Sequence, residues 1–174
     1  ESVWVPAWKV TKSSAKRDSS ITVGRPNIRP MGGSAPSSHS RKIWGSIVND
    51  SRSFVLQLQS FVNKGNENTI KEIAFRHIAW CYSLGQSLRG LNPIENLEKY
   101  ISTDELTTIS KHNNKPLALL QLNAWQIADL KDKEQLDIFG QIQINNTLVN
   151  FSNSMGMGER IKNTIFPSTY RLFL

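Results

Sequence analysis

His77 and Cys81 are the residues whose types and spacing come nearest to a chemical site. They stand four positions apart in a stretch with helical periodicity, so both side chains would project from one helix face, as two metal ligands could. A metal site needs more than two ligands, and Cys81 is the only cysteine of the chain. We therefore interpret both as core or surface residues, and predict no metal site and no cofactor.

The signatures of common enzymes do not occur. Gly156-Met157-Gly158 lacks the further glycine and the preceding strand of a dinucleotide-binding motif, so we interpret it as the end of a helix. The sequence has no nucleophile elbow, zinc-protease helix or phosphate-binding loop. We expect a protein without catalytic residues, and not an enzyme.

The positive charge is concentrated near the start of the chain. The formal net charge is +7, a value that could indicate nucleic acid or an anionic membrane as partner. Residues 1–40 carry six Lys/Arg against two acids, whereas residues 41–174 carry fifteen against twelve, interspersed. We also expect Trp44, Trp80 and Trp125 to pack in a core rather than to stack on bases. These observations argue against nucleic acid as a partner.

Helical periodicity begins at Arg41. Apolar residues at three-and-four spacing predict one helix that ends near residues 63–66 and a second from about Ile70 to Leu88, ended by Gly90 and Pro93. No alternating strand pattern of useful length occurs. The predicted fold class is all-α.

The second half of the chain predicts three more helices. Ser102 and Glu105 have the spacing of a capping box for a short helix, and Pro116 suits the first turn of the next. A long final helix is expected from about Lys133 to Met155, before Gly156 and Gly158. No stretch reaches the roughly 18–20 apolar residues that cross a bilayer, although a hydrophobic run starts to build up at the last residues.

Four blocks of sequence resemble bacterial members of the bestrophin family. They are RKIWGSIVNDSR (41–52), RHIAW (76–80) with LRG (88–90), NNKP (113–116) with LQL (120–122), and GERIKNT (158–164) with Phe166-Pro167 and Tyr170. The blocks occur in the family's order and cover nearly all of residues 41–174. The chain therefore resembles the cytosolic helical part of a bestrophin-like channel subunit.

The resemblance implies a homopentameric channel that conducts chloride or other small ions across the cell membrane. Residues 41–166 would form its cytosolic helical domain and residues 167–174 the start of a membrane helix. The sequence departs from the family in lacking the first two membrane helices and in ending where the third should begin. It also has Gly158 where many relatives have a cysteine.

The resemblance also suggests functional residues. In the family, one apolar side chain per subunit narrows the cytosolic end of the pore about sixteen residues before the Glu-Arg block, and counting back from Gly158 reaches Ile142, with Ile144 or Phe139 as the alternatives if the register differs. We expect Ile138 and Phe139 to pack one turn earlier. Glu159 and Arg160 would pair at the corner before the membrane helix.

Residues 1–40 are rich in Ser, Pro, Gly and basic residues, which predicts an irregular or disordered segment. The family has an Asp-Arg-Trp-Trp signature at this position. If the codons of Met31-Gly32 are read one nucleotide later, they encode Trp. In the same shifted frame, permissible codons for Arg29 and Pro30 encode Asp-Arg immediately before that Trp. A frameshift upstream of Arg41 would thus explain the missing membrane helix, and a natural disordered tail is the alternative.

A second function remains open at this point: a soluble all-helical interaction module with a basic N-terminal tail. The DNA that follows Leu174 separates the two hypotheses. An apolar helix of about 20 residues encoded there would favour the channel. A stop codon would favour the module.

Overall fold

The computed structural model describes residues 38–163, which form five α-helices and one short 3-10 helix. The elements are α1 (Ser38–Phe61), α2 (Glu67–Leu88), η2 (Leu97–Lys99), α3 (Thr103–Ser110), α4 (Lys115–Asp132) and α5 (Ile138–Asn163). Val62 and Leu136 form an isolated β-bridge, and residues 38–163 contain no longer strand. The predicted all-α fold is confirmed.

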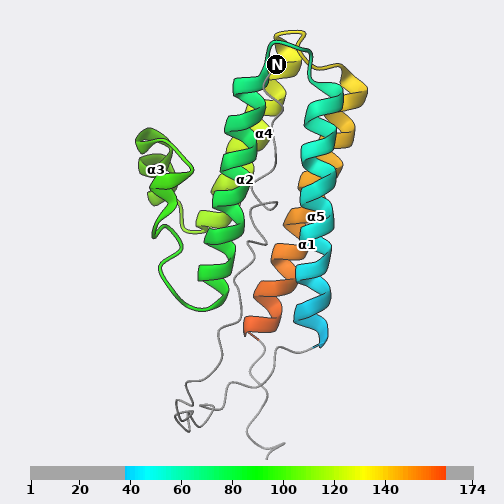
Figure 1. Ribbon diagram of the computed structural model, residues 1–174. Helices are drawn as coiled ribbons and strands as arrows, with labels where there is room; N and C mark the ends of the chain where they lie inside the picture. The colour runs from blue at the N-terminus through cyan, green and yellow to red at the C-terminus, as the bar shows by residue number, and fades with distance from the viewer. Residues whose placement is uncertain (1–37, 164–174) are drawn as a thin grey trace, which may run out of the picture. The chain divides into compact units, whose positions relative to one another are not determined.

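The four long helices form two antiparallel pairs. α1 lies along α5, and α2 lies along α4, while α3 stands to the side of α2 and α4 (Figure 1). At one end, the α1–α2 turn meets the α4–α5 turn: the Asn63 amide donates to the Gln135 carbonyl (2.9 Å), and Asn66 Nδ2 donates to Gln135 Oε1 (2.7 Å). At the other end of the bundle α1 begins and α5 ends (Figure 1).

Capping residues set the start of the helices in the middle of the chain. The Ser102 hydroxyl accepts from the Glu105 amide, and the Glu105 carboxylate accepts from the Ser102 amide, so the predicted capping box of α3 is confirmed. Asn114 caps α4 by accepting from the Leu117 amide (3.0 Å). Pro116 occupies the first turn of α4, as predicted, where its missing N–H has no helical partner to lose.

The bounds predicted for the final helix are wrong at both ends. The chain after α4 makes a turn in which Glu134 has a positive φ of 57°, and α5 therefore begins at Ile138 rather than near Lys133. α5 also continues through Gly156 and Gly158 to Asn163. A glycine favours a helix end but does not impose one. Here the burial of Met155 and the close packing of Gly158 on Leu88 hold this turn of α5 on the bundle.

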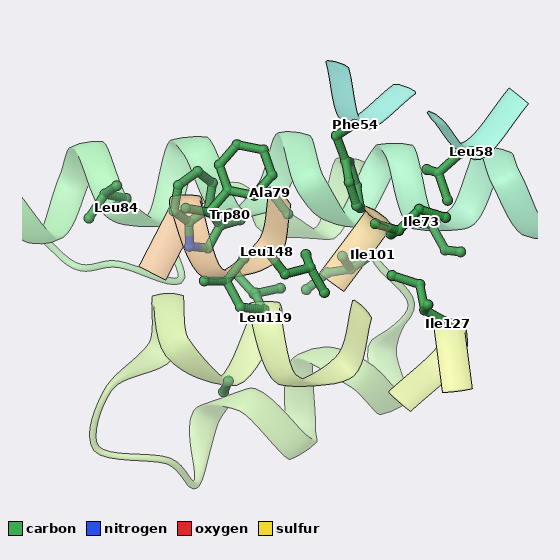
Figure 2. Packing of buried hydrophobic residues seen from close by; sticks show 14 of the residues in the cluster. Phe54, Leu58, Ile73, Ala79, Trp80, Leu84, Ile101, Leu119, Ile127 and Leu148 are labelled. Atoms are coloured by element: carbon green, nitrogen blue, oxygen red, sulfur yellow. The ribbon is translucent and has the colours of Figure 1, made fainter. Parts of the chain in front are cut away.

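The core lies between the two helix pairs. Phe54 and Leu58 of α1 face Ile73, Trp80 and their neighbours on α2, while Leu119 and Ile127 of α4 and Leu148 of α5 approach from the other side (Figure 2). Trp80 is fully buried, as predicted. Trp44 and Trp125 are 42% and 56% exposed, so the prediction that they pack in the core is wrong within this chain.

None of the helices within residues 38–163 combines the length and the apolar character that a membrane crossing requires. The irregular or frameshifted segment was expected at residues 1–40, but residues 38–40 already belong to α1. The rest of that segment and the expected start of a membrane helix at 167–174 lie outside the described residues. The domain bounds at 40 and 166 stay predictions.

Candidate functional site

Helix α5 buries one side and exposes the other. Its buried residues recur at helical spacing and pack on α1, α2 and α4. They are Gly140, Ile144, Thr147, Leu148, Phe151, Ser154 and Met155. At 3.6 residues per turn, Ile142 comes opposite the middle of this buried stripe, and half of its side chain is exposed (50%). The candidate constriction residue therefore points away from its own subunit's core.

The neighbours of Ile142 differ sharply in exposure. Ile144 is 0% exposed and belongs to the core, which removes it as an alternative constriction residue. Phe139 is 75% exposed, and Ile138 is 50% exposed. The expectation that these two residues pack one turn earlier is therefore wrong within the chain, where Leu136 and Gly140 are the buried residues at this level. Ile138, Phe139 and Ile142 together form an exposed apolar rim at the start of α5.

The exposed side of α5 carries amides and apolar residues, Val149 and Met157 among the latter, instead of charges. Gln143, Asn146, Asn150 and Asn153 are exposed at spacings of three, four and three, and we call them the amide row. No Asp, Glu, Lys or Arg occurs between Ile138 and Gly158. Sequence reasoning missed this row, although the recurrence of amides at helical spacing in an uncharged stretch was visible in the sequence.

Glu159 has a partner on another helix. Its Oε1 atom accepts from Nδ2 of Asn114 (3.1 Å), the residue that caps α4. Glu159 and the exposed Arg160 both lie within the last turns of α5, not beyond the end of the helix as expected. The pairing of Glu159 with Arg160 at a corner before the membrane stays a prediction.

A buried polar cluster joins α2, α3 and α4. Arg76, 7% exposed, donates from Nε to Glu105 Oε1 (2.7 Å) and from Nη1 to Asn123 Oδ1 (3.0 Å), and Gln126 also accepts from it. The same carboxylate closes the capping box of α3. Arg76 thereby fixes the short helix to the long pair α2 and α4.

His77 and Cys81 lie together, as their spacing predicted, but in a site suited to packing. The Ser51 hydroxyl donates to the Ile47 carbonyl, so it accepts from His77 Nε2 (2.8 Å), and this assigns the ring proton to Nε2. Phe54, Trp80 and Phe151 surround the imidazole.

Burial controls the ionisation of both groups. It lowers the pKa of His77 to about 4 and raises the pKa of the Cys81 thiol to about 11. A neutral imidazole and a protonated thiol are the stable forms at neutral pH. Among the described residues no group of three or more metal-ligating side chains converges here or elsewhere.

A cavity of about 530 Å³ opens where α1 begins and where α2 and α5 end. Ile43, Trp44, Leu88 and Ile161 supply apolar walls, and the basic side chains of Arg41, Arg89 and Lys162 line it as well. Lys162 Nζ donates to the Ser87 carbonyl at the end of α2 (2.5 Å). This end of the bundle is thus positively charged, in contrast to the uncharged side of α5.

Comparison with known proteins matches most of the chain to channel proteins. A sequence model of the bacterial and fungal bestrophin proteins matches residues 38–174. The voltage-dependent anion channel-forming protein YneE of Escherichia coli O157:H7 is 27% identical over 134 residues, and the one named alr2987 of Nostoc sp. is 30% identical over 142. Each match covers 77% of this chain but only 43% and 45% of those proteins, so the chain spans less than half of their length.

Solved structures share the fold. Two crystal structures of substituted forms of a bestrophin homologue from Klebsiella pneumoniae superpose with TM-scores of 0.73 and 0.69, at 23% and 22% identity. They cover 78% and 72% of this chain and 50% and 48% of theirs. The helical arrangement of residues 38–163 therefore occurs in proteins that extend well beyond the matched part.

Proposed function

Because the chain belongs to the bacterial and fungal bestrophin family, we propose that it contributes the helical part of a channel subunit that conducts chloride or other small anions across a membrane. The names of the E. coli and Nostoc relatives support anion conduction. The relatives are more than twice as long as their matched segment, which leaves room for membrane helices outside it.

The bundle lies on the cytoplasmic side of the membrane in this proposal, and five copies surround one passage. α1 begins and α5 ends at the same end of the bundle, so membrane segments attached to both would lie on one side (Figure 1). The basic residues Arg41, Arg89 and Lys162 lie at that end. Positive charge next to a membrane is expected on its cytoplasmic face.

Ile142 forms the constriction of the passage. The single observation that carries this assignment is its half-exposed position opposite the buried stripe of α5. Five such side chains in a ring make a narrow apolar gap, in which an ion loses part of its hydration and size decides passage.

Glu159 and Arg160 hold the end of α5 in the orientation that the adjoining membrane segment needs. The contact of Glu159 with the cap of α4 supports a structural role. In the full-length channel, Glu159→Ala should lower both the yield of pentamer and the thermal stability. Wild-type values of both would remove Glu159 from this role.

A chimera allows the proposal to be tested. In it, residues 38–174 replace the matching segment of the Klebsiella pneumoniae bestrophin homologue. The chimera should form pentamers and carry current in planar bilayers, and Ile142→Ala should change the relative permeability of small and large ions. Leu56→Ala, which truncates an exposed apolar side chain of α1, is the matched control. A pentameric chimera without current would contradict the channel, and unchanged permeability of Ile142→Ala would remove Ile142 from the constriction.

A further inference from the structure

We infer that the amide row of α5 lines the ion passage between the constriction and the membrane end of the bundle. It gives this part of the passage a wall without fixed charge. The inference rests on the proposed channel function, and goes beyond it by assigning a lining and a mode of selectivity to Gln143, Asn146, Asn150 and Asn153. These residues continue the exposed side of α5 from Ile142 towards the end of the helix.

The distribution of charge singles out α5 among the long helices. α1 exposes Arg41, Lys42 and Arg52, α2 exposes Lys71 and Glu72, and α4 exposes Asp129 and Lys131. α5 exposes no charged residue between Ile138 and Gly158, and this stretch is longer than the stretches without exposed charge in α2 (residues 73–88) and α4 (residues 116–128). An exposed helix face in water normally carries charges, so this face has a different environment in the assembly.

Cyclic symmetry explains such a face. Around a five-fold axis, one residue of the axis-facing helix is repeated in every subunit at the same height, so a single charged residue becomes a ring of five like charges. Like charges at short distance destabilise the assembly and would strongly bias which ions enter. The helix that faces the axis is therefore expected to have the longest stretch without exposed charges, and among the described helices this is α5, from Ile138 to Gly158.

Amide side chains suit this position chemically. Each presents N–H groups that donate to an anion and a carbonyl oxygen that accepts from water or approaches a cation. A row of amides can thus replace part of an ion's hydration without holding the ion by net charge. Selection in this stretch then depends on size and hydration, and preference for anions comes from elsewhere in the protein.

Adding a charge to the row tests the inference in the Klebsiella chimera. Asn146→Asp should lower the anion-to-cation permeability ratio by about threefold or more, and Asn146→Lys should raise it, because each places five equal charges around the passage. Gln59→Glu adds the same charge to the exposed side of α1 and should leave the ratio unchanged. Equal ratios in wild type, Asn146→Asp and Asn146→Lys would overturn the inference while leaving the channel intact.

A cysteine variant covers the case in which the added charge prevents assembly. In a background without native cysteines, current through Asn146→Cys should fall on addition of a negatively charged thiol reagent, and current through Gln59→Cys should not. An Asn146→Cys channel that conducts and ignores the reagent would overturn the inference. A chimera that assembles but carries no current with the native residues would instead overturn the proposed function, and the inference with it.

Discussion

Asn114 connects the start of α4 to the end of α5 through the oxygen and the nitrogen of its side-chain amide. Its Oδ1 atom accepts from the Leu117 amide (3.0 Å) and caps α4, and its Nδ2 atom donates to Glu159 Oε1 (3.1 Å) on α5. Forty-five positions separate Asn114 and Glu159 in the sequence. The contact therefore joins two helices at the end of the bundle that faces the membrane in the proposed channel.

Asn114→Asp separates the two roles of this residue. Aspartate caps a helix as well as asparagine does, but it places a second carboxylate against Glu159 and removes the donor. We expect the free energy of unfolding of the 174-residue chain to fall by about 1–2 kcal/mol in urea denaturation. Adding Glu159→Gln should recover most of the loss, because the new glutamine amide can donate to the carboxylate introduced by Asn114→Asp. A double variant no more stable than Asn114→Asp would show that Glu159 is not the partner that matters.

Gly140 marks the closest approach of α5 to the end of α1. A Cβ atom added there would lie 2.8 Å from Phe61 Cβ, 2.7 Å from Asp137 Oδ1 and 2.9 Å from Leu136 Cδ1. Gly140→Ala should therefore lower the free energy of unfolding by about 1–3 kcal/mol through overpacking. Gly156→Ala is the matched control on the same helix: its Cβ meets no atom within 4 Å, so alanine should stabilise by up to about 1 kcal/mol. Equal effects of the two substitutions would contradict the close approach.

The Arg76–Glu105 pair is buried enough for its loss to be costly. Its side chains are 8% and 23% exposed, and removing the charge of Glu105 leaves the guanidinium without its carboxylate. Glu105→Gln keeps the length that the capping box needs and should still cost about 2–4 kcal/mol of stability. Asp129→Asn, which breaks the exposed pair with Lys133, should cost less than about 0.5 kcal/mol. Comparable losses in the two variants would show that burial does not strengthen the Arg76 pair.

Stability should fall in mild acid because of His77. Burial lowers the pKa of His77 to about 4, whereas the unfolded chain binds this proton near pH 6.5. Between these values the unfolded state binds more protons than the folded state, so the free energy of unfolding decreases as the pH falls, by about 3 kcal/mol in total.

His77→Gln should flatten this dependence when urea denaturation is measured between pH 6.5 and 4, and the exposed His112→Gln should preserve it. Parallel profiles of wild type and His77→Gln would show that His77 titrates in the folded protein much as it does in the unfolded one.

The features that were predicted correctly from the sequence are those that depend on residues close to one another in the chain. The capping box at Ser102 and Glu105 and the first-turn proline of α4 were correct, because both depend on contacts within a few positions. The predicted end of α5 was wrong because Gly158 is held by packing on Leu88, a distant residue. Arg76 with Glu105 and Asn114 with Glu159 could not be foreseen either, since no local spacing relates the partners. Ile142 came from the register of a resemblance, and its exposure from the structure alone.

Thiol modification at Ile142 tests the central claim most directly. In the Klebsiella chimera without native cysteines, Ile142→Cys places a thiol at the proposed constriction, and Ile144→Cys places one in the core two positions away, where exposure is 0%. A charged thiol reagent added from the cytoplasmic side should block most of the current through Ile142→Cys within the time of a recording and leave Ile144→Cys unchanged. Undiminished current through Ile142→Cys, with labelling of its thiol confirmed by mass spectrometry, would contradict the claim that α5 lines the ion passage at this residue.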